Sequence, residues 1–212
     1  MISVEEARRL YPADDSAHGF AHVLRVWRLV QRIGPREGAD MPLLEAAALL
    51  HDVARADEEA GGPCHAQAGA ERARQILAAC PAEQVEAVAE AIRTHRYRAN
   101  LAPRTLEARI LYDADKLDAI GAVGVARAFA IAGKHNHLLY AEVSADYAER
   151  QRQEGRGDAG NTAHTAVHEF VFKLSRLKDT LFTATAKEIA TERHRFMVAF
   201  FERLASEVKG EL

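Results

Sequence analysis

The stretch from Pro42 to Ala54, PLLEAAALLHDVA, decides the fold. A proline at its start and apolar residues on nearly every side are typical of a helix buried at the centre of a domain. The pair His51-Asp52 ends this apolar run. A carboxylate in such surroundings destabilises the fold by several kcal/mol unless a cation or another charged group compensates it. We therefore expect the chain to bring a partner to Asp52.

Helical periodicity continues on both sides of this stretch. Apolar residues recur on a single helical face from Val23 to Ile33, and Gly34-Pro35 is expected to end that helix. The same pattern predicts further helices at about 64–79, 82–95, 105–117, 118–133, 163–178 and 184–208. No segment alternates with a period of two for long enough to indicate a strand. The sequence therefore predicts an all-α fold.

Length and composition favour one globular domain. The 212 residues, of which 48% are hydrophobic and 28% are charged, match a single domain with a substantial core. We expect this domain to span residues 1–212, with its core at about 14–130 and C-terminal helices at 163–208. Glycine, asparagine and charged residues gather at about 134–162, which predicts a mobile loop or lid there.

Charge and hydropathy argue against several classes of partner. The 28 basic and 31 acidic side chains give a net charge of −3 without a broad basic face, so a long nucleic acid is not an expected ligand. No apolar run approaches the roughly 18 residues of a membrane span, and the N-terminus is charged where a signal peptide would be apolar. Cys64 and Cys80, at opposite ends of one predicted helix about 24 Å long, are too far apart for a disulfide. A cytoplasmic protein with no membrane partner is expected.

Two further residues, His22 and Asp115, have the chemistry to join the buried pair. Each lies beside apolar residues that hold its backbone in the core. Two imidazoles and two carboxylates would give a divalent cation a neutral shell of nitrogen and oxygen ligands, with open positions for water and a phosphate oxygen. Adjacent helical residues point about 100° apart, so His51 and Asp52 can share an ion only near a helix end or between helices.

Three aspartates lie in the stretch ILYDADKLDAIG, residues 110–121. Asp113 and Asp115 point about 200° apart on a helix, so at most one of them is expected to be a ligand. Asp115 and Asp118 share a helical face, which predicts a substrate contact or a supporting role for Asp118. Lys116, next to Asp115, is expected to counter phosphate charge.

The ordered set His22, His51, Asp52 and Asp115 resembles the H…HD…D signature of the HD-superfamily metal-dependent phosphohydrolases. The chain is similar to a compact bacterial branch of single-domain HD hydrolases over about 14–207, through DDSAHGFAHVLRV, LLHDVAR, AIRTHRY, DADKLDAIGAVGVAR, HEFVFKL and KEIATERHRFM. The resemblance implies an HD-domain helical bundle with additional C-terminal helices, whose four signature residues bind a divalent ion such as Mn, Mg, Fe, Co, Ni or Zn. It also implies hydrolysis of phosphate esters or anhydrides, often of nucleotides.

Other residues are candidates for catalysis and for binding. His65 and His95 precede Asp115, where some relatives carry ligands for a second metal, although phosphate binding or a supporting role is favoured here. His18 lies four residues before His22 and shares its helical face, and Arg25 follows His22 by one turn. The predicted catalytic residues are Asp52, Lys116, His65 and His95, and the predicted substrate-binding residues are His18, Arg25, Lys116 and Asp118.

The acid that follows the HD pair in some relatives is missing from its position. Arg55 occupies that position, and the acidic residues Asp57, Glu58 and Glu59 come later. We therefore expect a metal-bound water to attack phosphorus directly. The expected substrate is a small phosphorylated molecule, foremost a nucleotide, cleaved by a pyrophosphohydrolase or nucleotidase. A cyclic-nucleotide phosphodiesterase and a non-catalytic, metal-binding nucleotide sensor are the alternatives, and self-association into a homo-oligomer is left open.

Overall fold

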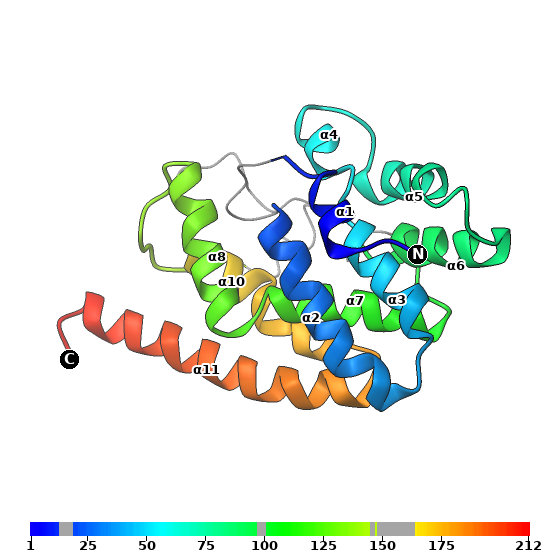
Figure 1. Cartoon of the computed structure of the whole chain (residues 1–212). Coiled ribbons are helices and arrows are strands. Elements are labelled where there is room, and N and C mark those ends of the chain that lie inside the picture. Colours follow the sequence, from blue (N-terminus) through cyan, green and yellow to red (C-terminus); the bar gives the residue numbers. More distant parts are fainter. Residues whose placement is uncertain (13–18, 97–100, 145–146, 148–163) are drawn as a thin grey trace. The chain divides into compact units, whose positions relative to one another are not determined.

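The computed structural model describes residues 1–12, 19–96, 101–144, 147 and 164–212. These residues form helices and connecting segments without any strand, which confirms the all-α prediction (Figure 1). Within the same ranges, no helix combines the length and the apolar character that a membrane span requires. The chain divides into two compact units, Met1–Lys116 with Leu181–Ala186, and Leu117–Thr180 with Lys187–Leu212.

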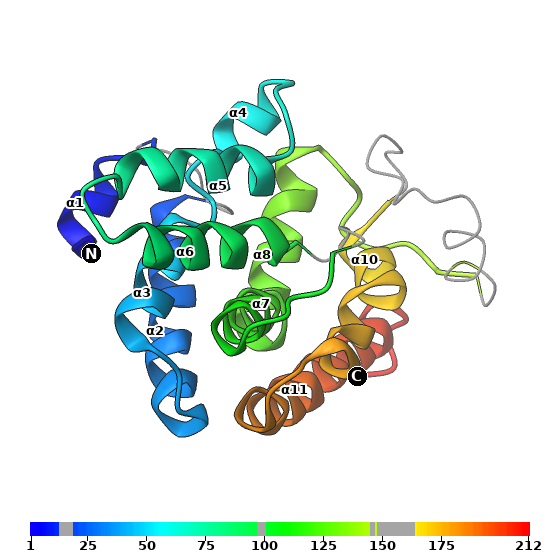
Figure 2. The same ribbon diagram turned by 90° about the vertical axis from the view of Figure 1, so that its right-hand side faces the viewer.

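The first unit contains the helices around the His51-Asp52 pair. They are α1 (Val4–Arg8), α2 (Phe20–Glu37), α3 (Met41–Leu50), α4 (Arg55–Glu59), α5 (His65–Ile76), α6 (Ala82–Thr94) and α7 (Leu106–Asp118), the last two residues of which belong to the second unit. Helix α3 packs against both α2 and α6, and α5 lies beside α6 (Figure 2). Residues Leu44, Leu49 and Leu50 of α3 are fully buried, as the apolar sequence of this helix predicts. Helix α3 is therefore the central element of this unit.

Helix α2 is longer than the sequence predicts. It passes through Gly34-Pro35 and ends at Glu37, and its C-cap Gly38 has a φ of 79°, in the left-handed region that glycine adopts readily. The predicted stop at Gly34-Pro35 is wrong because a proline in the last turn removes only one helical hydrogen bond. Gly34 instead allows α3 to approach, since a Cβ atom there would lie 2.5 Å from the sulfur of Met41.

Helix α3 is shorter than the predicted 42–54. It begins behind Asp40, whose side chain accepts a hydrogen bond from the backbone N–H of Leu43, and it ends at Leu50 with His51 as the C-cap. Residues 51–54 form a turn. The buried pair therefore lies at a helix end, which is one of the two arrangements that let both side chains face a common point.

The second unit contains α8 (Gly121–Lys134), α10 (Ala166–Phe172), the 3₁₀ helix η1 (Leu174–Thr180) and most of α11 (Ala184–Val208). The single helix predicted at 163–178 is wrong, because Lys173 leaves helical geometry at φ −127° and ψ −56° and separates α10 from η1. Within this unit α10 contacts α8, and the Phe170 ring stacks on Phe201 at a centroid distance of 4.3 Å. Most of the lid predicted at about 134–162 lies outside the described residues, at 145–146 and 148–162.

Candidate metal centre

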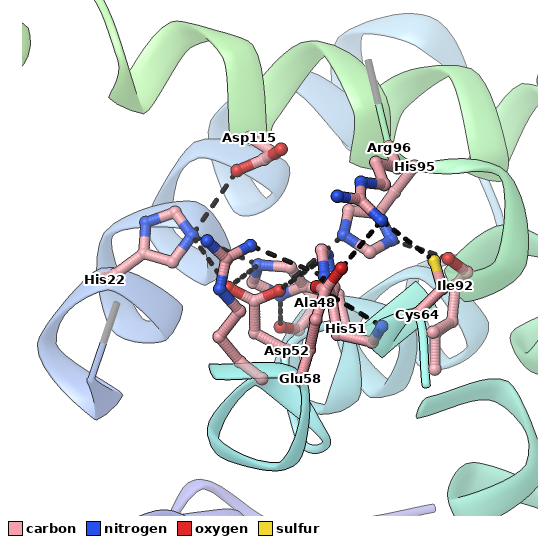
Figure 3. Close-up of polar contacts among 12 residues, drawn as sticks. His22, Ala48, His51, Asp52, Glu58, Cys64, Ile92, His95, Arg96 and Asp115 are labelled. Atoms are coloured by element: carbon pink, nitrogen blue, oxygen red, sulfur yellow. Dashed lines mark hydrogen bonds and ion pairs between the residues drawn. The ribbon is translucent and has the colours of Figure 1, made fainter. Parts of the chain in front are cut away.

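The first unit brings the side chains of His22, His51, Asp52 and Asp115 to one place (Figure 3). His22 lies in the first turn of α2, and its Nε2 is 3.2 Å from Nε2 of His51. The same His22 atom is 3.7 Å from Oδ2 of Asp52 and 3.4 Å from Oδ1 of Asp115 on α7. His51 and Asp52 are 0% and 5% exposed. Three helices thus place four polar groups in the core of the unit.

Two more histidines face the other oxygen of Asp52. His65 is the first residue of α5 and His95 is the C-cap of α6. Their Nε2 atoms lie 3.5 Å and 3.7 Å from Oδ1 of Asp52, and both side chains are buried. Oδ2 of Asp52 meanwhile lies 3.7 Å from Nε2 of His51. The two oxygens of Asp52 therefore face different histidine pairs.

This donor set fits a divalent cation. The side chains form two groups whose ligand atoms lie within 4.8 Å of one another, namely His22, His51 and Asp52, and Asp52, His65 and His95. The contacts to Asp52 exceed the usual hydrogen-bond range of about 2.7–3.2 Å. They are close to the roughly 3–3.5 Å that separates two ligands when each lies about 2.1 Å from a shared ion. The residues could thus hold one ion, or two ions that share Asp52.

Hydrogen bonds to the backbone orient two of the imidazoles. Nδ1 of His51 lies 2.8 Å from the carbonyl oxygen of Ala48, and Nδ1 of His95 lies 2.5 Å from that of Ile92. A carbonyl oxygen only accepts, so each Nδ1 carries the hydrogen and, in the neutral ring, leaves Nε2 with a lone pair. Both lone pairs are then directed toward Asp52, as a metal site requires.

Burial and neighbouring charges set the protonation states. Burial lowers the pKa of His51 to about 4 and also lowers the pKa of His65, which keeps both rings neutral near pH 7. Burial alone would raise the pKa values of the two carboxyl groups. The imidazole of His51 nevertheless holds the pKa of Asp52 well below its ordinary value, and the ammonium of Lys116 does the same for Asp115. Neutral imidazoles and ionised carboxylates are the forms that bind metal.

The remaining predicted site residues have varied surroundings. Lys116 is buried, with Nζ 2.5 Å from Oδ2 of Asp115 and donating to the backbone oxygen of His95 at 3.2 Å. Asp118, in the second unit, is buried and forms an ion pair with Arg127 at 2.9 Å. Arg25 is half-buried on α2. The predicted substrate contact His18 lies outside the described residues.

Sequence reasoning missed two residues beside His65. Oε2 of Glu58 contacts Nδ1 of His65. Oε1 of Glu58 is 2.9 Å from Nη1 of Arg96 (Figure 3). Burial tends to raise the pKa of Glu58, but the contacts to His65 and Arg96 outweigh it and lower that pKa. No helical spacing connects Glu58 to His65, because a turn separates α4 from α5. The sequence therefore carries no periodic signal for this contact.

An all-helical bundle with this histidine and aspartate cluster, built on an adjacent His-Asp pair, defines a member of the HD superfamily. The family model described as HD domain matches residues 19–120. The chain is 35% identical to the uncharacterized protein YpgQ of Bacillus subtilis over 201 residues, which cover 93% of this chain and 87% of YpgQ. It belongs to the HD superfamily, whose solved relatives include predicted hydrolases.

Solved structures extend the similarity to the fold. The crystal structure of Bacillus subtilis YpgQ matches with a TM-score of 0.74 and 30% identity, over 98% of this chain and 96% of that one. The structure of YpgQ in complex with ADP matches with a TM-score of 0.72 and 30% identity, over 98% and 99% of the two chains. A predicted HD superfamily hydrolase of an uncultured Thermotogales bacterium matches with a TM-score of 0.66 and 30% identity, over 96% and 90%.

The lowered pKa of His51 predicts how the stability of the metal-free protein depends on pH. The unfolded chain binds a proton on this residue near pH 6.5, whereas the folded protein does so only near pH 4. The contribution of neutral His51 to the unfolding free energy is therefore complete above pH 6.5 and is lost as the pH falls toward 4. The difference corresponds to roughly 3 kcal/mol of unfolding free energy. Urea unfolding at a series of pH values, after removal of metal by a chelator, measures it.

The matched variant is His51→Asn, which keeps a side-chain donor near the carbonyl oxygen of Ala48 but does not titrate. Its unfolding free energy is expected to change less between pH 6.5 and pH 4.5 than that of the parent protein. Equal pH dependence in both proteins would contradict the assignment of this effect to His51.

Proposed function

We propose that the chain hydrolyses a phosphoester or phosphoanhydride bond of a nucleotide, with a divalent metal ion held by His22, His51, Asp52 and Asp115. The observation that carries this proposal is the placement of Asp52. Its carboxylate is buried among imidazole nitrogens at 3.5–3.7 Å, where a bound cation would compensate its charge. Membership of the HD superfamily and the ADP bound by YpgQ support the same conclusion.

Different residues of the chain would bind the ion and bind the phosphate group of the substrate. When bound, the cation supplies charge neutralisation and a water of lowered pKa. Lys116 balances the charge of Asp115 and donates to the backbone oxygen of His95, which ties two parts of the centre together. Arg55 and Arg96, about one third exposed, are the guanidinium groups near His65 that would attract phosphate oxygens.

The position of Arg55 bears on the mechanism. Its Nε is 3.2 Å from Oε1 of Glu59, and its Nη1 is 3.4 Å from Nδ1 of His65. No carboxylate from that position reaches the centre, so the proposal contains no dedicated carboxylate base there. Hydrolysis by water activated at the cation needs none. Because Arg55 stands where some relatives carry an acid, the sensor hypothesis is tested as well: a centre without a base could bind a nucleotide and release no product.

The test measures the release of phosphate and of pyrophosphate from nucleoside tri-, di- and monophosphates, and the formation of nucleoside monophosphates from cyclic monophosphates, with manganese, magnesium, cobalt, nickel and zinc in turn. Asp115→Ala removes a proposed ligand and is expected to lower the rate by more than about a hundredfold. Thermal unfolding checks that the variant is folded. Pyrophosphate and a nucleoside monophosphate formed from a triphosphate would identify a pyrophosphohydrolase. Inorganic phosphate and a nucleoside formed from a monophosphate would identify a nucleotidase, and a monophosphate formed from a cyclic monophosphate would identify a phosphodiesterase. Equal rates for both proteins would contradict the metal assignment, and nucleotide binding without product would favour the sensor.

A further inference from the structure

Among the histidines around Asp52, His51, His65 and His95 are oriented by two different kinds of hydrogen-bond acceptor. His51 and His95 both cap the C-terminal end of a helix, and each places Nδ1 against the carbonyl oxygen three residues earlier. The last carbonyl groups of a helix lack a partner within the helix, so this acceptor is available to any histidine at a C-cap. A C-terminal position therefore both places and orients an imidazole.

His65 cannot use this device, because it is the first residue of α5. The residue three positions earlier, Gly62, precedes the helix, so no helical carbonyl lies behind the ring. The acceptor comes from another helix instead. Oε2 of Glu58, on α4, contacts Nδ1 of His65, and the backbone N–H of His65 lies 3.4 Å from the same oxygen. One carboxylate thus meets both the backbone and the ring of this residue.

Glu58 is itself held in place. Nη1 of Arg96, the residue after His95, lies 2.9 Å from Oε1 of Glu58 and 3.1 Å from the sulfur of Cys64. This guanidinium connects the end of α6 to α4 and to the residue before α5 (Figure 3). Glu58 is about one quarter exposed, whereas His65 is 3% exposed. The carboxylate therefore supports a buried ring from its outer side.

We propose that Glu58 is a positioning residue of the metal centre, which keeps hydrogen on Nδ1 of His65 and directs Nε2 toward Asp52. A carboxylate accepts hydrogen bonds and an ionised one donates none, so the contact selects the ring form with hydrogen on Nδ1. Arg55 favours the other form, with hydrogen on Nε2, because its Nη1 is 3.4 Å from Nδ1 of His65 and can only donate. The role of His65 as a metal ligand rests on the proposed function. The position of the hydrogen on its ring does not depend on that function.

The ring form is measurable in the metal-free protein by nitrogen-15 NMR at pH 7.5, with the His65 signals assigned from their loss in His65→Asn. The parent protein is expected to show a protonated Nδ1 and an unprotonated Nε2. Glu58→Ala is expected to give a mixture of both forms, and Glu58→Gln, whose amide oxygen still accepts, is expected to keep the parental form. Asp57→Ala is the matched control, since it removes a carboxylate of α4 that pairs with the exposed Arg72.

Metal affinity supplies a second readout. Manganese binding measured by calorimetry is expected to weaken by about tenfold to a hundredfold in Glu58→Ala, to recover largely in Glu58→Gln and to be unchanged in Asp57→Ala. Hydrogen on Nε2 of His65 in the parent protein would overturn the proposal. An unchanged ring form in Glu58→Ala would do so as well, and so would unchanged manganese affinity.

Failure of the proposed function gives a different result. If the protein hydrolyses none of the nucleotides while Glu58 still controls the ring form of His65 and manganese affinity, the inference about Glu58 stands and the hydrolase proposal fails. If nucleotides are hydrolysed but Glu58→Ala leaves the ring form and manganese affinity as in the parent, only the inference about Glu58 fails. Should Glu58→Ala not fold, the ring form of the parent and the behaviour of Glu58→Gln still decide the question.

Discussion

Replacing Asp52 with alanine is expected to remove the bound divalent cation and to lower nucleotide hydrolysis by more than about a thousandfold. Both candidate ligand groups contain this residue, since Oδ2 faces His22 and His51 while Oδ1 faces His65 and His95. No other carboxylate in the described part of the chain is shared by the two groups. Metal content after dialysis, measured together with phosphate and pyrophosphate release, tests the prediction.

The stability of the variant separates metal loss from unfolding. Asp52 is a buried carboxylate whose charge the neighbouring imidazoles stabilise even without a cation, since its pKa lies well below the ordinary value. The thermal midpoint of metal-free Asp52→Ala is therefore expected to be lower than that of the metal-free parent, and a variant that is still folded at the assay temperature but holds no cation shows that metal loss is not caused by unfolding. Asp52→Asn, which keeps the shape and removes the charge, serves as the conservative control and is expected to lose the cation too. Retention of metal and turnover by either variant would contradict the proposed centre.

The same measurement shows whether the centre takes one ion or two. With two ions sharing Asp52, the parent protein binds two per chain, and His22→Ala and His65→Ala each lose one. With a single ion in the group of His22, His51 and Asp52, the parent binds one, and His65→Ala retains it. The spacing of the side chains is compatible with both arrangements.

Replacing Asp113 with alanine is expected to destabilise the protein by about 3 kcal/mol or more while leaving metal binding intact. The carboxylate is 0% exposed and accepts hydrogen bonds from the backbone N–H of Phe182 at 2.9 Å and of Thr183 at 2.8 Å. It also accepts one from the hydroxyl of Thr183 at 2.7 Å. Alanine would leave these donors without their acceptor in the interior of the first unit. Urea unfolding and metal content measure the two effects.

A graded series checks the origin of this destabilisation. Thr183→Val removes the hydroxyl donor among those described above and is expected to reduce the unfolding free energy by about 1–2 kcal/mol. Asp113→Asn keeps an acceptor oxygen but adds an N–H₂ group that faces donors, so we expect an intermediate loss. A change of less than about 1 kcal/mol in Asp113→Ala would show that these bonds do not stabilise segment 181–186 as the structure indicates.

The contrast between Asp113 and Asp115 shows how much of the site could be predicted from the sequence. Helical geometry correctly predicted that the two side chains diverge. The apolar residues beside each were alike, so residue type alone does not show which carboxylate anchors a distant segment and which meets His22. The structure separates their surroundings, with Asp113 on Phe182 and Thr183 and Asp115 on His22 and Lys116.

The helical fold and the set of side chains that would have to meet at Asp52 follow from the amino-acid sequence alone. Helical periodicity and the apolar stretch around His51-Asp52 are local properties, and a buried carboxylate demands compensation wherever it lies. The way in which these side chains reach one another depends on tertiary packing. This packing extended α2 past Gly34-Pro35, because α3 packs on a glycine, and it brought Glu58 to His65 across a turn. Contacts between elements depend on packing, which no period within one helix encodes.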